Sequence, residues 1–160
     1  LWKRPLMSGI FDWNSKVFQS SDYDPDDKLY VRYSKSDISQ ESDQLEVNSI
    51  RFPDFSCNWS KLSQPDSVRN RQNGLSTDGC YSFTAQVSRY KQMATPCHDP
   101  IPDNYAHSEV RQLLPDEPVT LAPPKNRKLS RQREGWSKSQ RLEYRQNLVN
   151  NLNVEIAPLA

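Results

Sequence analysis

The sequence has few residues that can build a large apolar core. Only 34% of its 160 residues are hydrophobic, and the mean hydropathy is −0.91. Aromatic residues nevertheless make up 10% of the chain and include four tryptophans, which is more than disordered chains carry. The length suits one domain. We therefore expect a small core with long polar loops.

Long apolar runs are also lacking. No stretch approaches the roughly 18 apolar residues that a membrane span needs, and no signal peptide is recognisable. The three cysteines, Cys57, Cys80 and Cys97, are an odd number, which does not suit a disulfide framework and fits a reducing compartment. We expect a cytoplasmic protein without membrane association.

The chain has almost no excess of charge of either sign. Its net charge of +1 excludes a global attraction to nucleic acid or to anionic membranes. The charge is unevenly distributed, because residues 22–54 hold nine acidic and four basic side chains, whereas residues 125–145 hold eight basic and two acidic ones. The two segments could therefore pair with each other.

Periodicity and turn residues predict an α+β fold, a small, mostly antiparallel sheet with one or two helices and long polar, proline-rich loops. Alternation of apolar and polar residues is clearest in "GCYSFTAQVSRYK". Ser137 is a suitable N-cap for the longer helix. We expect strands at 28–34, 45–52, 79–91, 105–114 and 153–158, and helices near 64–71 and over 138–150.

The segment "ATPCHDPIPDN" is expected to be an extended loop because of its three prolines. Residues 1–27 are interpreted as an aromatic and acidic N-terminal extension that could contact a protein partner. Residues 28–160 are expected to form one α+β domain, with a proline-rich connection near 114–126 and a basic C-terminal segment at 125–145.

Two metal-dependent alternatives fit poorly. Zinc sites usually draw their ligands in close pairs about two to four residues apart, and here only Cys97 and His98 are neighbours. A metal nuclease of the His-Asn-His type needs more chain than separates His98 from Asn104. We therefore predict no metal site and no cofactor.

A third alternative is an ADP-ribosyltransferase-like site with one polar residue on each of several strands. Arg32 in "YVRYS", a polar group in "SCNWS" and Glu109 in "HSEVR" occur in the required order, with the carboxylate meeting developing positive charge. Single polar residues on strands are common, however, and Arg32 beside Tyr33 also fits a stacked surface pair.

The basic segment could bind nucleic acid, because cations neutralise phosphates and aromatic rings stack on bases. The same charges could instead pair with the acidic segment or form a solvated helix face. The candidate nucleic-acid-binding residues are Lys125, Arg127, Lys128, Arg131, Arg133, Lys138 and Trp136.

The segments "RFPDFSCNWSKLSQPDSV" and "HDPIPDNYAHSEV" resemble a family of small, uncharacterised bacterial proteins of genomic defence and conflict gene neighbourhoods. The resemblance covers Ile50–Val68 and His98–Val110 and supplies a setting, with no assigned activity. It implies that the family's signature falls here on Asn58, Trp59, Ser60, Tyr105, His107 and Glu109.

Two functions follow as hypotheses. The preferred one is a non-enzymatic binding or accessory subunit of a bacterial defence-type assembly, which contacts a protein partner and could also contact RNA or DNA. In it, Asn58, Trp59, Ser60, Tyr105 and His107 form a polar clasp that ties a loop to a strand. The alternative is a nucleotide- or nucleic-acid-directed enzyme with four candidate catalytic residues, His107, Glu109, Asn58 and Arg32. Their convergence in an open cleft would favour the enzyme, and aromatic residues covering them would favour the binding module.

Overall fold

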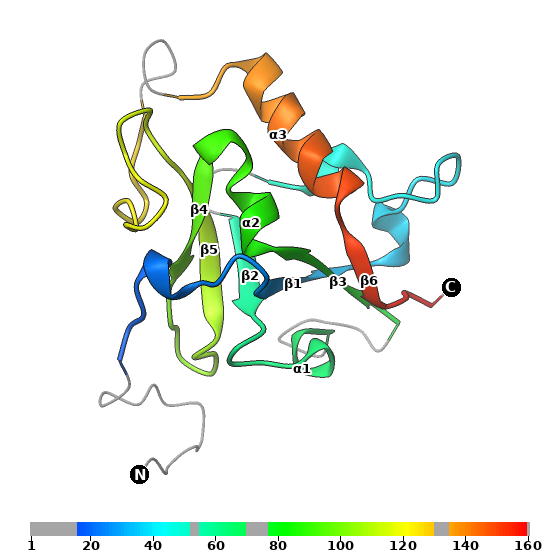
Figure 1. The fold of residues 1–160 in the computed structure, drawn as a ribbon. Coiled ribbons are helices and arrows are strands. Elements are labelled where there is room, and N and C mark those ends of the chain that lie inside the picture. Colours follow the sequence, from blue (N-terminus) through cyan, green and yellow to red (C-terminus); the bar gives the residue numbers. More distant parts are fainter. Residues whose placement is uncertain (1–15, 52–54, 70–76, 130–134, 160) are drawn as a thin grey trace.

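The computed structural model describes residues 16–51, 55–69, 77–129 and 135–159 (Figure 1). One antiparallel sheet has the strand order β4-β5-β2-β1-β3-β6, which confirms the predicted α+β class. The strands are β1 (Lys28–Tyr33), β2 (Phe55–Trp59), β3 (Gly79–Thr84), β4 (Ala94–His98), β5 (His107–Gln112) and β6 (Asn153–Ile156). The α-helices are α1 (Pro65–Arg69), α2 (Ala85–Ser88) and α3 (Lys138–Asn150). Short 3₁₀ helices are η1 (Ser20–Asp22), η2 (Lys35–Asp37), η3 (Val47–Ser49) and η4 (Tyr90–Gln92).

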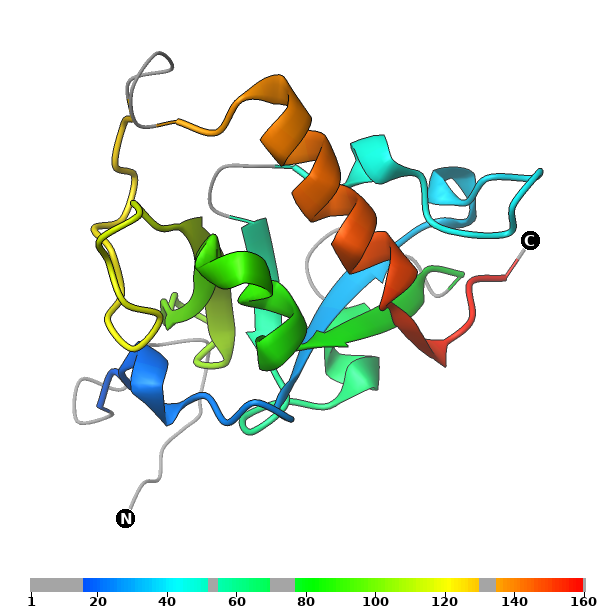
Figure 2. The same cartoon turned by 45° about the horizontal axis from the view of Figure 1, so that its top comes forward.

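The main core lies between one face of the sheet and α3. Leu29 of β1 is paired with Trp59 of β2 on one side and with Phe83 of β3 on the other, and all three are almost fully buried. Figures 1 and 2 show α2 and α3 over this face, while α1 lies on the opposite side.

The predicted C-terminal helix is confirmed, with its start at the predicted cap. The Ser137 hydroxyl accepts a hydrogen bond from the backbone N–H of Gln140, and the Gln140 side chain returns one to Ser137 N–H. Tyr144 and Leu148 of α3 enter the main core. Leu142, on the same helix, lies outside this core and is 57% exposed.

One predicted strand and one predicted loop are wrong, each because tertiary pairing decides the outcome. Within 45–52 the structure has η3, and Leu45 forms only an isolated bridge with Ile38. The expected loop "ATPCHDPIPDN" begins with strand β4 instead. Pro96 is tolerated there because β4 is an edge strand that pairs with β5 alone.

The alternating segment at 79–91 is a strand only in its first half. β3 ends at Thr84, whose hydroxyl accepts a hydrogen bond from Val87 N–H and so caps α2. None of the described helices is long and apolar enough to cross a bilayer.

The part of the predicted N-terminal extension that the structure describes is packed on the domain. Tyr23 is 1% exposed and stacks on Trp59, with ring centroids 3.9 Å apart. Phe18 meets the same tryptophan edge-on. Residues 1–15 lie outside the described part of the chain. The boundary predicted at residue 27 therefore falls too late, because packing against the sheet begins near Phe18.

The proline-rich connection near 114–126 has neither helix nor strand, as predicted, but polar contacts attach it to the sheet. Thr95 donates to the Val119 carbonyl at 2.6 Å, and Arg111 donates to the Pro123 carbonyl at 3.0 Å. Arg127 closes the segment with two hydrogen bonds to the Glu117 carboxylate, at 2.7 and 2.8 Å.

The Arg127–Glu117 pair provides a first test. Its hydrogen bonds lower the pKa of Glu117, so the pair stabilises the fold fully above the unfolded-state pKa of about 4.3 and loses this effect as pH falls through the folded-state pKa. We expect R127A to lower the free energy of unfolding by about 1–2 kcal/mol at neutral pH. Urea unfolding across a pH series should show wild type and variant converging in acid.

The matched control is K128A, because Lys128 is exposed in the same segment. It should change stability by less than about 0.5 kcal/mol. A difference between wild type and R127A that persists unchanged at low pH would contradict the assigned pair.

Candidate functional site

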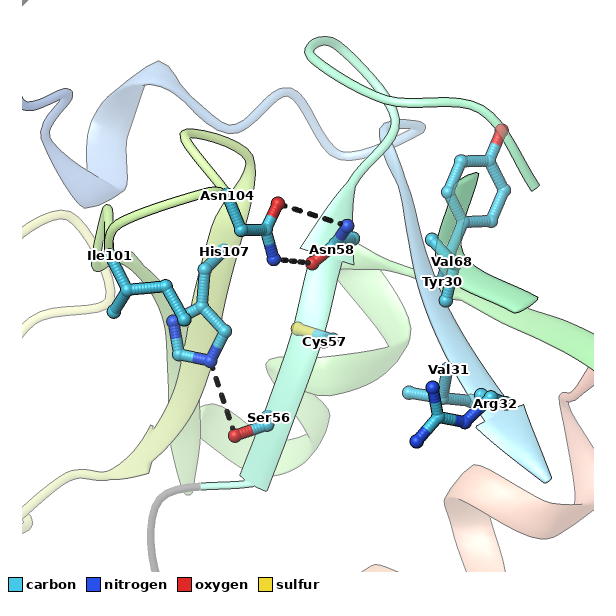
Figure 3. Close-up of a pocket in the computed structure, with 10 residues that line it drawn as sticks. All are labelled: Tyr30, Val31, Arg32, Ser56, Cys57, Asn58, Val68, Ile101, Asn104 and His107. Atoms are coloured by element: carbon cyan, nitrogen blue, oxygen red, sulfur yellow. Dashed lines mark hydrogen bonds between the residues drawn. The ribbon is translucent and has the colours of Figure 1, made fainter. Parts of the chain in front are cut away.

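The second face of the sheet holds a polar cavity of about 320 Å³. The antiparallel register sets Tyr30 beside Asn58 and Asn58 beside His107, which makes a row across β1, β2 and β5. Figure 3 shows the labelled side chains around the cavity. The lining residues are Tyr30, Val31, Arg32, Ser56, Cys57, Asn58, Val68, Ile101, Asn104 and His107.

Two asparagines close one end of the cavity. Asn104 Nδ2 donates to Asn58 Oδ1 at 2.8 Å, and Asn58 Nδ2 donates back to Asn104 Oδ1 at 3.3 Å (Figure 3). Both residues are buried, and the pair joins β2 to the turn between β4 and β5. This pair joins the two segments in which the clasp was predicted, but its second member, Asn104, is not one of the predicted clasp residues.

His107 is held between two other polar residues. Its Nδ1 lies 2.8 Å from the Asp99 carbonyl oxygen and 3.1 Å from Asp99 Oδ2. Its Nε2 lies 3.3 Å from Ser56 Oγ, on the side that faces the cavity (Figure 3). His107 thus links a strand serine to an aspartate across two strands.

Glu109, the candidate carboxylate of the enzyme hypothesis, is engaged elsewhere. Its Oε1 lies 2.9 Å from both Nε and Nη2 of Arg111, and the residue is 8% exposed. Glu109 does not line the cavity. The structure therefore brings His107, Asn58 and Arg32 together, as the enzyme hypothesis required, but not Glu109.

Arg32 brings a positive charge to the cavity. Its Nε lies 3.7 Å from Asp78 Oδ2, and 29% of its side chain is exposed. Arg32 and Ser56 also line a second hollow of about 290 Å³, where the exposed Arg51 adds another cation. The two hollows share this stretch of β1 and β2, so a ligand in one is close to the charges of the other.

The remaining clasp residues have structural partners. Trp59 is buried and its indole N–H donates to Asp27 Oδ2 at 3.0 Å, while Ser60 Oγ accepts from the Lys28 N–H at 3.0 Å. The Tyr105 hydroxyl donates to the Lys16 carbonyl. These contacts fasten the ends of β2 and the N-terminal segment, and none of these three residues lines the cavity.

His98 is also structural. Its Nδ1 accepts from the Phe18 N–H at 2.9 Å, and its Nε2 donates to the Tyr105 carbonyl at 2.7 Å. Burial lowers the pKa of His98, which favours the neutral ring that these two bonds require. Both ring nitrogens are satisfied, so neither is available to a metal or to a substrate.

The cysteines of the zinc alternative are buried as free thiols. Burial raises the pKa of Cys57, and it raises the pKa of Cys80 to about 12, which disfavours the thiolate that binds metals. Among the described residues, no three His, Cys, Asp or Glu side chains gather as a metal site would need.

The basic segment differs from the predicted nucleic-acid surface. Trp136 is 7% exposed and packs against Tyr144 in the core, so its ring cannot stack on a base. Lys125 contacts Asp99 at 2.9 Å, and Arg127 binds Glu117. Charge pairing within the chain is thus partly as predicted, but these partners lie outside the acidic segment. Lys128 and Lys138 are exposed, and Arg131 and Arg133 lie outside the described residues.

Comparison of the chain with protein-family models, with curated proteins and with solved structures gave no match. The residues themselves are therefore the basis for the function.

Sequence reasoning considered Asp99 and Asn104 only within the metal-nuclease alternative, and it did not single out Ser56. A strand at "FSCNW" would have set Ser56 and Asn58 on one face by simple alternation. Asp99 and Asn104 reach the cavity only because the loop after β4 folds back on β5, where Asp99 N–H donates to the His107 carbonyl at 2.9 Å. No local sequence pattern indicates that the loop after β4 folds back on β5.

The asparagine pair can be tested by its effect on stability. N104A removes both amide bonds and leaves the buried Asn58 amide without this partner, so the free energy of unfolding should fall by about 1–3 kcal/mol. The double variant N58A/N104A should lose less than the sum of the two single variants, because both remove one interaction. Chemical denaturation of all four proteins measures this coupling, and strictly additive losses would contradict it.

Proposed function

We propose that the chain is a ligand-binding module whose polar sheet face takes a small organic anion. The observation that supports this most directly is the cavity in which Arg32, Ser56, Asn58 and His107, from three adjacent strands, meet. Ligand sites are concave and combine apolar walls with a few convergent polar groups. The cavity has this composition, and its volume lies near the lower end of the range for small-molecule sites.

The lining groups indicate the chemistry of the ligand. Arg32 offers a charge-assisted, two-pronged contact to a phosphate or carboxylate, and Arg51 adds positive charge next to it. Tyr30, Val68 and Ile101 give the same cavity an apolar lining that suits a ring or short alkyl part. A small molecule with one anionic group and one apolar part fits both features.

The setting of this module is a hypothesis that follows from the sequence resemblance. In that setting the chain is a subunit or accessory domain of a bacterial defence-type assembly that contacts a protein partner. The enzyme hypothesis with Glu109 as the reacting carboxylate has little support, because that carboxylate is paired with Arg111 and does not line the cavity. Contact with RNA or DNA has less support from the structure than from the sequence, because Trp136 is buried.

Amide chemical shifts can test the module with three probes: phenyl phosphate, benzoate and the neutral benzyl alcohol. The two anions should shift the amide signals of Ser56, Asn58 and His107, and the alcohol should bind much more weakly. Comparing the anions tells whether phosphate or carboxylate is preferred. R32A should weaken anion binding by about tenfold or more, since a hydrogen bond to a charged group contributes about 1.5–3 kcal/mol.

The matched control is K138A, which removes one exposed positive charge at the start of α3, on the other side of the sheet. Its affinity should equal that of the wild type. Equal loss in both variants would mean that only net charge matters, and equal binding of the alcohol would contradict an anion site.

A further inference from the structure

The cavity contains a serine, a histidine and an aspartate in the order that activates a nucleophile. Ser56 Oγ lies 3.3 Å from His107 Nε2, and the other ring nitrogen lies 3.1 Å from Asp99 Oδ2. Ser56 is exposed and lines both hollows, so a ligand can reach its hydroxyl. From this geometry we infer that the protein is an acyl hydrolase or acyltransferase with Ser56 as its nucleophile and His107 as its general base.

The proton on His107 is fixed by its surroundings. The Asp99 carbonyl oxygen, 2.8 Å from Nδ1, can only accept a hydrogen bond, so Nδ1 carries the hydrogen of the neutral ring. Nε2 is then a bare acceptor that faces the Ser56 hydroxyl. This is the tautomer that a base must have to take a proton from serine, and the separation lies close to hydrogen-bond reach.

Asp99 acts as the positioning residue. Its carboxylate is held by Lys125, at 2.9 Å and 3.0 Å, and lies 3.7 Å from Arg111. Its backbone N–H also donates to the His107 carbonyl, so it cannot easily turn away. A carboxylate beside Nδ1 stabilises the positive charge that the ring acquires when Nε2 takes the proton.

The reaction balances without any further reagent. Ser56 Oγ bonds to the acyl carbon of an ester while its proton passes to His107 Nε2. The bond from that carbon to the alcohol oxygen then breaks, and the leaving alkoxide takes the proton from Nε2. Water then gives a proton to Nε2 and bonds to the acyl carbon. The bond from that carbon to Ser56 Oγ breaks, and Oγ takes the proton back from Nε2, which releases the acid and restores Ser56. Another alcohol in place of water gives transfer.

The charges of the cavity select the substrate class. Negative charge builds up on the acyl oxygen as Ser56 attacks, and Arg32 is the cation that lines the cavity with this serine. Arg51 lines the second hollow, which Ser56 also lines. The expected substrate is therefore a small ester that carries an anionic group, and a neutral ester of the same size should react more slowly.

A fluorophosphonate probe tests the nucleophile directly, because serine attacks its phosphorus and displaces fluoride. Wild-type protein should be labelled, and mass spectrometry should place the label on Ser56. S56A should abolish labelling, and H107Q should slow it by about a hundredfold or more. D99N should slow it less than H107Q, because it keeps the backbone carbonyl. The control S67A, which removes an exposed serine on α1, should react like the wild type.

A cysteine variant keeps the test decisive if H107Q fails to fold. The three natural cysteines are buried, so S56C would carry the reactive thiol. Iodoacetamide should alkylate S56C at least about tenfold faster than S67C at neutral pH, since an adjacent histidine favours the thiolate. Equal rates, an unlabelled wild type, or a label on another residue would each overturn the inference.

The labelling test of the Ser56 nucleophile can fail or succeed independently of the test of anion binding. S56A should still bind phenyl phosphate, because Arg32 remains, while it loses the fluorophosphonate label. Labelling of wild-type Ser56 without any anion binding would support the nucleophile and contradict the anion site. Hydrolysis of 4-nitrophenyl hemisuccinate no faster than that of 4-nitrophenyl acetate would overturn the anionic substrate class.

Discussion

The alternation of side chains along β1, β2 and β5 is the constraint on which the rest of the structure depends. Leu29 and Trp59 are paired across the ladder and are fully buried in the main core. The next residues, Tyr30 and Asn58, must therefore point to the opposite face. A shift of one residue would exchange the two sets and put Asn58 into the hydrophobic core in place of Trp59. The hydrophobic core thus fixes which polar groups meet in the cavity.

The hydrogen bonds that position the residues lining the cavity also stabilise the fold. The turn after β4 returns to β5 through paired hydrogen bonds between Ile101 and Asn104, and the amides of Asn104 and Asn58 then join it to β2. His107 and Asp99 are tied by backbone as well as by side chain. Groups positioned by strand pairing are held more closely than groups on free loops, which suits a site that must keep one geometry.

The sequence predicted the parts of the fold in which local chemistry and tertiary environment agree. Ser137 caps α3 because its hydroxyl and the Gln140 side chain satisfy each other, and the pattern of "HSEVRQ" gives β5. Prediction from the sequence failed where a residue's structure or burial depends on a partner that is distant along the chain. β4 is a strand despite Pro96, because it lies at the edge of the sheet and pairs with β5 alone. Trp136 is buried in the core, where its ring packs against Tyr144.

The same argument explains why Glu109, one of the four candidate catalytic residues, does not line the cavity. Glu109 and Ser56 are directly opposed in the β2–β5 ladder, so alternation places both on the polar face. Arg111 lies two residues further on the same strand and reaches the Glu109 carboxylate, which leaves that charge buried and satisfied. Asp99, brought back by the turn after β4, occupies Nδ1 of His107 and leaves Nε2 directed at Ser56. The neighbours of the two opposed residues therefore decide which of them faces the cavity: Arg111, on the same strand, binds Glu109, whereas Ser56 faces His107, which is distant along the chain.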